Sequence, residues 1–213
     1  MTGVQHFDTF LLSSLVFCLL PGQDTMYVVA STASGGLRAG IVSACGINFG
    51  NILHVVFAGI GMSSLLYANE TLFMGVLFAG GGYLCFLGVC ELKNSKGSCS
   101  IDLQDVRRST RSLFGRAVLT NLLNVKVITF FLAFIPQFVN VSSEFRIYGF
   151  FLLGTIFVLF STLWCLMLAT GISHLRLSRW DGALLHRTGH LLGGTILLLL
   201  GLGVLRSLFL SFI

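Results

Sequence analysis

The stretch LLPGQDTMYVV, residues 19–29, places a proline, a glycine, a glutamine and an aspartate inside an otherwise apolar segment. Pro21 removes a helical hydrogen bond and Gly22 lets the chain bend, so the stretch predicts an interrupted helix. Asp24 follows the break directly. A second stretch, TNLLNVKVITFFLAF at residues 120–134, sets Lys126 in equally apolar surroundings. Each half of the chain therefore carries one ionisable residue within an apolar segment.

The composition is typical of an integral membrane protein. Of the 213 residues, 55% are hydrophobic and 10% are charged, whereas soluble domains carry about 25% charged residues. The mean hydropathy is +0.91. The net charge of +5 does not indicate nucleic-acid binding, because the basic residues flank apolar segments. No Cys/His spacing is typical of a metal site, and we expect no cofactor and no enzymatic activity.

Apolar segments long enough to cross a bilayer, which takes about 20 residues per helix, recur along the chain. They predict an all-α fold with six transmembrane helices at approximately 7–31, 40–67, 71–91, 117–139, 147–172 and 189–212. Because three is odd, two halves of three helices enter the membrane in opposite senses, as inverted repeats with interrupted first and fourth helices. We expect a single membrane domain over 1–213, with repeat 1 at about 1–91, a basic loop at 92–116 and repeat 2 at about 117–213.

The basic residues predict the orientation of the chain. Of the 13 lysines and arginines, ten fall on one side of the predicted spans. They are Arg38, Lys93, Lys96, Arg107, Arg108, Arg111, Arg116, Arg176, Arg179 and Arg187. The positive-inside rule makes this side cytoplasmic and places both termini on the opposite side.

The two ionisable residues are predicted to lie at similar depth. Asp24 precedes the cytoplasmic end of the first span by about eight residues, and Lys126 follows the cytoplasmic start of the fourth by about nine. At 1.5 Å per helical residue, both lie roughly 12–14 Å below the boundary. One interpretation is a charge pair that only locks the two halves together. The other is a wet pocket for a zwitterion, in which Asp24 faces the ammonium or exchanges a proton, and Lys126, helped by Asn124, faces the carboxylate.

The second predicted span carries a polar face. At 100° per residue, Gly46, Gly50, Asn51 and His54 fall within an arc of about 140°. The glycines are most simply helix-packing residues, while Asn51 and His54 are able to form hydrogen bonds towards the interior. His54 is a candidate proton relay, because imidazole titrates near neutral pH, or a satisfied polar side chain. Asn48 lies off this arc and is given no role.

Two long blocks of this sequence resemble the LysE/RhtB family of bacterial amino-acid exporters. The block LLPGQDTMYVVASTASGGLRAGIVSACGINFGNILH, residues 19–54, is similar to the family's first block, which reads PGPD-T followed by RxG and a histidine. The block FGRAVLTNLLNVKVITFFLAFIPQFV, residues 114–139, is similar to its second, which contains NPK and PQF. The resemblance covers nearly the whole chain.

The resemblance implies a six-span protein of the bacterial inner membrane, with periplasmic termini and export driven by the proton gradient. Substrate binding and gating are implied for Pro21, Gly22, Gln23, Asp24, Asn124 and Lys126, with His54 and Asn51 as candidates for a proton relay or polar lining. The expected partners are a small amino acid or similar zwitterion, protons, the lipid bilayer and, for a small transporter, a second copy as a homodimer. No nucleic acid is expected.

Two departures from the family pattern leave an alternative open. Gln23 stands where the family usually has a second proline, and Val125 stands where NPK has its proline. Without that proline, we expect the fourth helix to continue past Val125 without a kink. The alternative function is a non-transporting membrane interaction or assembly protein derived from the exporter fold. A thiol redox enzyme is disfavoured, because residues 117–139 contain no cysteine.

Overall fold

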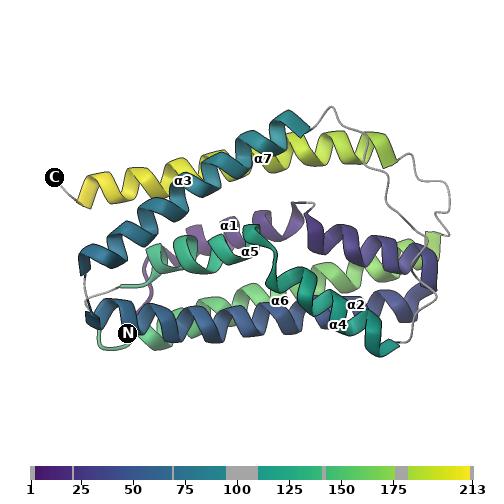
Figure 1. The fold of residues 1–213 in the computed structure, drawn as a ribbon, viewed down its shortest axis with the longest axis horizontal. Coiled ribbons are helices and arrows are strands. Elements are labelled where there is room, and N and C mark those ends of the chain that lie inside the picture. The colour runs from purple at the N-terminus through teal and green to yellow at the C-terminus, as the bar shows by residue number, and fades with distance from the viewer. Residues whose placement is uncertain are drawn as a thin grey trace.

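The computed structural model describes residues 3–20, 22–68, 70–94, 110–140, 143–175 and 182–211, which form long helices packed side by side (Figure 1). In chain order these are α1 (Phe7–Leu19), α2 (Gln23–Ala68), α3 (Glu70–Asn94), α4 (Thr110–Leu122), α5 (Val125–Thr129), the π-helix η2 (Phe130–Phe134), the 3₁₀-helix η3 (Ile135–Phe138), α6 (Arg146–Leu175) and α7 (Gly182–Ser211). Among these described residues the β-structure is limited to one isolated bridge between Val4 and Val139. The predicted all-α class is confirmed.

The first break lies between α1 and α2. Leu20, which precedes Pro21 in the sequence, has an extended backbone with φ −65° and ψ 122°. This is the conformation that a following proline favours. Pro21 itself lies outside the described residues. The helix resumes at Gln23, and α1 and the first part of α2 run in the same direction (Figure 1).

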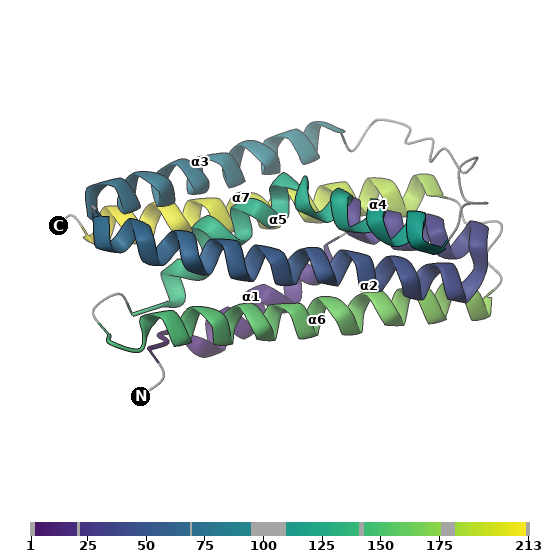
Figure 2. The same cartoon turned by 60° about the horizontal axis from the view of Figure 1, so that its bottom comes forward.

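The chain reverses within α2, at Gly36. This residue has φ 74° and ψ −173°, a left-handed conformation that glycine adopts without a Cβ clash. The part of α2 that follows Gly36 runs back along the molecule, in the direction opposite to the part before it (Figures 1 and 2). The turn falls in the interval between the first two predicted spans.

The second break lies between α4 and α5, and here the prediction of an unkinked helix past Val125 is wrong. The helical segments on either side of residues 123–124 are bent by 50°. The cause is Asn124, which has an extended backbone, φ −75° and ψ 100°, and whose Oδ1 accepts a hydrogen bond of 3.1 Å from the backbone N–H of Lys126. Asparagine is a favoured N-cap, so a new helix starts at this point without a proline.

The helices extend into the predicted basic loop from both sides. Helix α3 continues to Asn94 and α4 begins at Thr110. Residues 95–109 lie outside the described part of the chain, as do the orienting arginines Arg176 and Arg179.

By length and composition, Gln23–Gly61 and Arg146–His174 are able to cross a membrane, and α4 with Val125–Phe138 adds a third span if the bent pair is counted as one. Shorter apolar helical segments are Phe7–Leu19, Met74–Cys90 and Leu197–Arg206.

Aromatic side chains form the core next to the two breaks. Phe17 of α1, Phe130 of η2 and Phe157 of α6 are buried, and the Phe130 ring centroid lies 4.3 Å from that of Phe17 and 4.2 Å from that of Phe157. These ring contacts hold α1 and η2 against α6.

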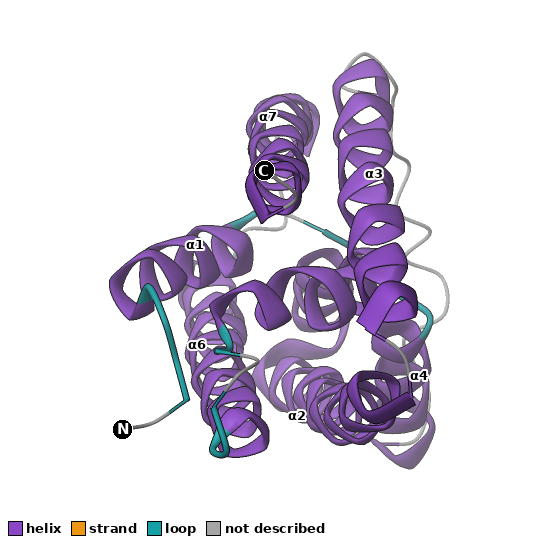
Figure 3. Cartoon of the chain, turned by 90° about the vertical axis from the view of Figure 1, so that its left-hand side faces the viewer, coloured by secondary structure: helices purple, strands orange, loops and turns teal. Residues whose placement is uncertain are grey.

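The helices form two groups. Viewed along the helices, α3 and α7 lie together on one side of the bundle, with α2 and α6 on the other (Figure 3).

Glycines allow close helix contacts. A Cβ added at Gly46 would lie 2.6 Å from the Ala117 Cβ, and one added at Gly50 would lie 2.4 Å from the Asn121 Oδ1. Both contacts join α2 to α4, and small residues permit such an approach in membrane bundles. The packing role predicted for these two glycines is confirmed.

Candidate functional site

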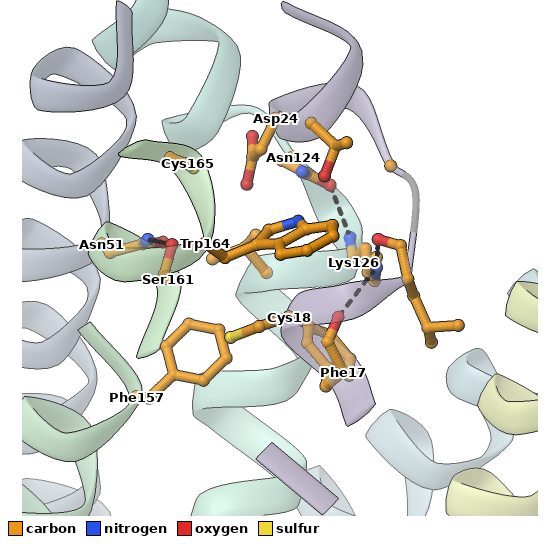
Figure 4. Close-up of a pocket in the computed structure, with 14 residues that line it drawn as sticks. Phe17, Cys18, Asp24, Asn51, Asn124, Lys126, Phe157, Ser161, Trp164 and Cys165 are labelled. Carbon is orange, nitrogen blue, oxygen red and sulfur yellow. Dashed lines mark hydrogen bonds between the residues drawn. The ribbon is translucent and has the colours of Figure 1, made fainter. Parts of the chain in front are cut away.

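A cavity of about 30 Å³ lies where the two helix breaks meet (Figure 4). Its walls come from α1, both parts of α2, α5 and α6. The lining residues are Phe17, Cys18, Leu20, Gly22, Asp24, Thr25, Asn51, Asn124, Lys126, Val127, Phe157, Ser161, Trp164 and Cys165. About 10–15 Å³ open to the centre of a water-sized sphere holds one water, and a cavity of about 150 Å³ holds benzene, so in this conformation the cavity is too small for an organic solute.

Asp24 lies in the first turn of α2 and presents one unsatisfied acceptor. Its Oδ2 accepts a hydrogen bond of 3.0 Å from the Nδ2 of Asn121. Its Oδ1 is buried and has no hydrogen-bond partner among the described residues. A buried acceptor without a partner costs about 1–3 kcal/mol, more when charged. Asp24 is thus prepared to accept one further hydrogen bond.

Lys126, in the short helix α5, holds the broken end of α1. Its Nζ donates to the carbonyl oxygens of Leu20 at 3.2 Å and Phe17 at 3.5 Å, and lies 4.5 Å from the centroid of the Phe17 ring. Carbonyls at a helix C-terminus lack helical partners and carry the negative end of the helix dipole. A Cβ at Gly22 would lie 3.4 Å from this Nζ, so Gly22 leaves room for the ammonium. The lysine therefore stabilises the break in α1.

A chain of side-chain amides joins Asp24 to α6. Asn121 donates from its Nδ2 to Asp24 and also to the Oδ1 of Asn51, at 2.9 Å. Asn51 in turn donates to the Oγ of Ser161 at 3.0 Å and to the Oδ1 of Asn48 at 3.3 Å. All of these side chains except Asp24 are buried. The network ties α2, α4 and α6 together around the carboxylate.

His54 supports this network from outside the cavity. Its Nε2 lies 3.2 Å from the backbone carbonyl oxygen of Asn121, and its ring stacks on Phe131 with a centroid distance of 5.8 Å. It is not among the residues that line the cavity. Its described contacts hold α2 against α4 and η2.

The structure brings most of the predicted site residues together. Gly22, Asp24, Asn51, Asn124 and Lys126 all line the one cavity. Gln23 is exposed and Pro21 lies outside the described residues, so neither is placed at the cavity.

Sequence reasoning missed several residues of the site. Asn121 sits at the centre of the amide network, and its position three residues before Asn124 in TNLLN was an available signal. Ser161, Trp164 and Cys165 share one face of α6 through the i, i+3, i+4 spacing. Asn48 lies off the predicted arc, yet it reaches Asn51 from the same helix.

Helices long and apolar enough to cross a membrane, packed around a cavity with ionisable lining residues, are typical of a multi-pass membrane protein. Residues 15–208 match the family model described as the LysE type translocator, so the chain belongs to this family of transporters, which are not enzymes. The resemblance to this family noted from the two sequence blocks is thereby confirmed.

The relatives include both uncharacterised proteins and exporters. An uncharacterized membrane protein of Pseudomonas aeruginosa is 31% identical over 183 residues, covering 84% of this chain and 83% of that protein. Leucine efflux proteins of Salmonella typhimurium and Salmonella typhi are each 29% identical over 153 residues, or 72% of either chain. No solved structure shows a significant match to the chain.

Proposed function

We propose that this protein exports a small amino acid across a bacterial inner membrane in exchange for protons. The observation that carries the proposal is the buried Oδ1 of Asp24, an acceptor without a described partner at a cavity between two helix breaks. Intramembrane ionisable residues are usually functional, because burial of a charge is costly. The naming of relatives as leucine efflux proteins supports an amino acid as the solute.

The proposal includes six spans arranged as two inverted repeats. The segments α1 with the first part of α2, and α4 with Val125–Phe138, are both broken, and both breaks border the same cavity. The start of the first segment meets the end of the second, since the N–H of Gln5 donates to the Phe138 carbonyl at 2.8 Å. The two broken segments thus run in opposite senses, which inverted repeats require. With the basic segments cytoplasmic, both termini are periplasmic.

Asp24 is the carboxylate through which the exchange is proposed to run. Among the described residues that line the cavity, it is the sole acidic one. A substrate ammonium and a proton compete for the same carboxylate oxygens. Asp24 therefore binds either the substrate or a proton, and each transport cycle moves one in exchange for the other. Lys126 is proposed to act as the gate, because its bonds to the Phe17 and Leu20 carbonyls keep α1 against α5 and the cavity small. Movement of α1 away from α5 would make room for the solute.

The small cavity favours one competing function. At about 30 Å³ it has no room for an amino acid, which suits a non-transporting membrane interaction protein whose polar cluster only holds the helices together. Such a protein keeps its fold and its partners without any flux. A transport assay separates the two functions directly.

The test is the pair Asp24→Asn and Asp8→Asn, measured in proteoliposomes loaded with a panel of labelled amino acids, with and without a pH gradient. Asp8 is exposed in the first turn of α1 and provides the same chemical change away from the cavity. We expect gradient-driven flux for the wild type and Asp8→Asn, and loss of the gradient dependence for Asp24→Asn. Unchanged coupling in Asp24→Asn would contradict its role, and absence of flux in the wild type for every amino acid would support the non-transporting alternative.

A further inference from the structure

We infer that Trp164 of α6 is a specificity-determining residue: its indole N–H donates a hydrogen bond to the carboxylate of the substrate, and the pocket around it takes a neutral, apolar side chain. Trp164 belongs to neither of the sequence blocks that predicted the site. The inference rests on the proposed export function, and it names a residue and a substrate class within the same site.

The first observation is an unsatisfied donor. The Trp164 Nε1 is buried and has no hydrogen-bond partner among the described residues. Buried tryptophan N–H groups usually find a partner, and a buried donor without one is costly. Trp164 lines the cavity, and in Figure 4 its indole lies between Asp24 and Asn124 on one side and Phe157 and Cys18 on the other. The nitrogen is on the edge of the ring nearer to Asp24.

The donor and the acceptor at the cavity complement a zwitterion. The Oδ1 of Asp24 is able to accept from an ammonium, and the Nε1 of Trp164 is able to donate to a carboxylate. Both atoms are buried, both lack a described partner, and both belong to residues that line the cavity. One bound α-amino acid satisfies the pair, because it carries a donor and an acceptor on adjacent carbons.

Lys126, the cation that sequence reasoning assigned to the carboxylate, is already engaged, and the orientation of Asn124 is fixed by its helix cap. Lys126 Nζ donates to the carbonyls at the end of α1. Asn124 uses its Oδ1 to cap α5 through the N–H of Lys126. Using Lys126 for the substrate would leave the Leu20 carbonyl without this partner. Trp164 is able to donate at no such cost, since its N–H has no described partner to lose.

The remaining wall of the cavity determines the side-chain class. Its apolar part consists of Phe17, Cys18, Leu20, Val127, Phe157 and Cys165. These side chains provide contact area for a neutral apolar group and no second carboxylate for a basic one. A basic side chain placed there would be desolvated without a counter-charge, and the cation of the described lining, Lys126, is held by the carbonyls at the end of α1. The substrate is therefore an amino acid of the aliphatic or aromatic kind.

The test compares Trp164→Phe, which keeps a ring and removes the donor, with Tyr83→Phe, which removes a polar hydrogen from an aromatic residue of α3 outside the cavity lining. Flux of labelled leucine is measured in proteoliposomes, with unlabelled leucine, lysine and 3-methylbutylamine as competitors. We expect the leucine KM of Trp164→Phe to rise about tenfold, with kcat nearly unchanged, as for loss of one hydrogen bond to a charged group. Tyr83→Phe keeps the wild-type KM. The amine lacks a carboxylate, so its inhibition is the same in all three proteins.

An unchanged leucine KM in Trp164→Phe would overturn the role of Trp164, and competition by lysine equal to that by leucine would overturn the apolar selectivity. If the wild type carries leucine in either case, the proposed export function stands. If the wild type carries no amino acid, the export function itself is wrong. A second variant serves if Trp164→Phe fails to insert. The sequence contains two tryptophans, so Trp180→Phe leaves Trp164 as the only source of tryptophan fluorescence. Added leucine should change this fluorescence emission, and an emission that leucine leaves unchanged would refute the contact.

Discussion

Replacing Gly50 with alanine adds one methyl group at the contact that positions Asp24. The added Cβ would lie 2.4 Å from the Asn121 Oδ1 and 2.9 Å from both its Cβ and its Cγ. Rotation of the Asn121 amide cannot relieve the contact with its Cβ, because that atom is fixed to the backbone of α4. The helices must separate, and Asn121 must withdraw from Asp24 and Asn51.

The expected free-energy change follows from three contributions. Overpacking of a dense interior costs about 1–3 kcal/mol. Weakening of the Asn121 hydrogen bonds costs roughly 1 kcal/mol for the bond to Asn51 and about 1.5–3 kcal/mol for the bond to the Asp24 carboxylate. Alanine returns about 1 kcal/mol of helix propensity relative to glycine. The net expectation for Gly50→Ala is a destabilisation of about 2.5 kcal/mol if these effects are small and about 6 kcal/mol if both hydrogen bonds are lost completely.

The matched control is Gly61→Ala on the same helix, where an added Cβ meets no atom within 4 Å. Its expected effect is a stabilisation of up to about 1 kcal/mol. Thermal unfolding in detergent and leucine efflux from proteoliposomes are measured for both variants. We expect a lower Tm and reduced efflux for Gly50→Ala only. Equal Tm and equal efflux in the two variants would refute the argument that the α2–α4 contact holds Asp24 in place.

Two further substitutions test the first break and the α3–α7 contact. Lys126→Met removes the donor that holds the carbonyls of Phe17 and Leu20. Maleimide should then label Cys18, which lines the cavity, severalfold faster, while Cys85 on α3 reacts as before. An unaltered Cys18 labelling rate in site-resolved mass spectrometry would argue against a gate at Lys126. Gly201→Ala puts a Cβ 2.6 Å from the Cys85 Sγ and 2.7 Å from its backbone nitrogen, whereas Gly203→Ala on the same helix meets nothing within 4 Å. The first should lower the free energy of unfolding by about 1–3 kcal/mol and the second should not, and similar melting curves would count against this packing.

The helices and the first break were predictable because local chemistry determines them. Long apolar segments predict the helices, and a proline forces the residue before it into an extended conformation, as Leu20 shows. The second break was predicted to lack a kink, because Val125 replaces a proline. The structure bends there through an asparagine cap instead. Capping is also local chemistry, and TNLLN contained the signal.

The α6 wall of the cavity was not predictable from periodicity. Helix α6 is apolar around most of its circumference, so its sequence does not indicate which face points inward. Only packing against α1 and α2 places Ser161 and Trp164 at the cavity. Asn51 was predictable only in part. The sequence placed it on a polar helix face, but its hydrogen-bond partners on α4 and α6 depend on the fold.

The contacts of the two ionisable residues distinguish a structural lock from a binding site. A lock is most stable as a direct ion pair with every polar atom satisfied, because a partly satisfied buried network is worse than an apolar one. In the described contacts, Asp24 bonds to Asn121 and Lys126 bonds to the end of α1. The Oδ1 of Asp24 and the Nε1 of Trp164 stay without a described partner at the same cavity. Without a partner of any kind, two such atoms would together cost about 2–6 kcal/mol. A solute that satisfies both atoms would remove that cost, so the arrangement favours a site that binds and releases its ligand.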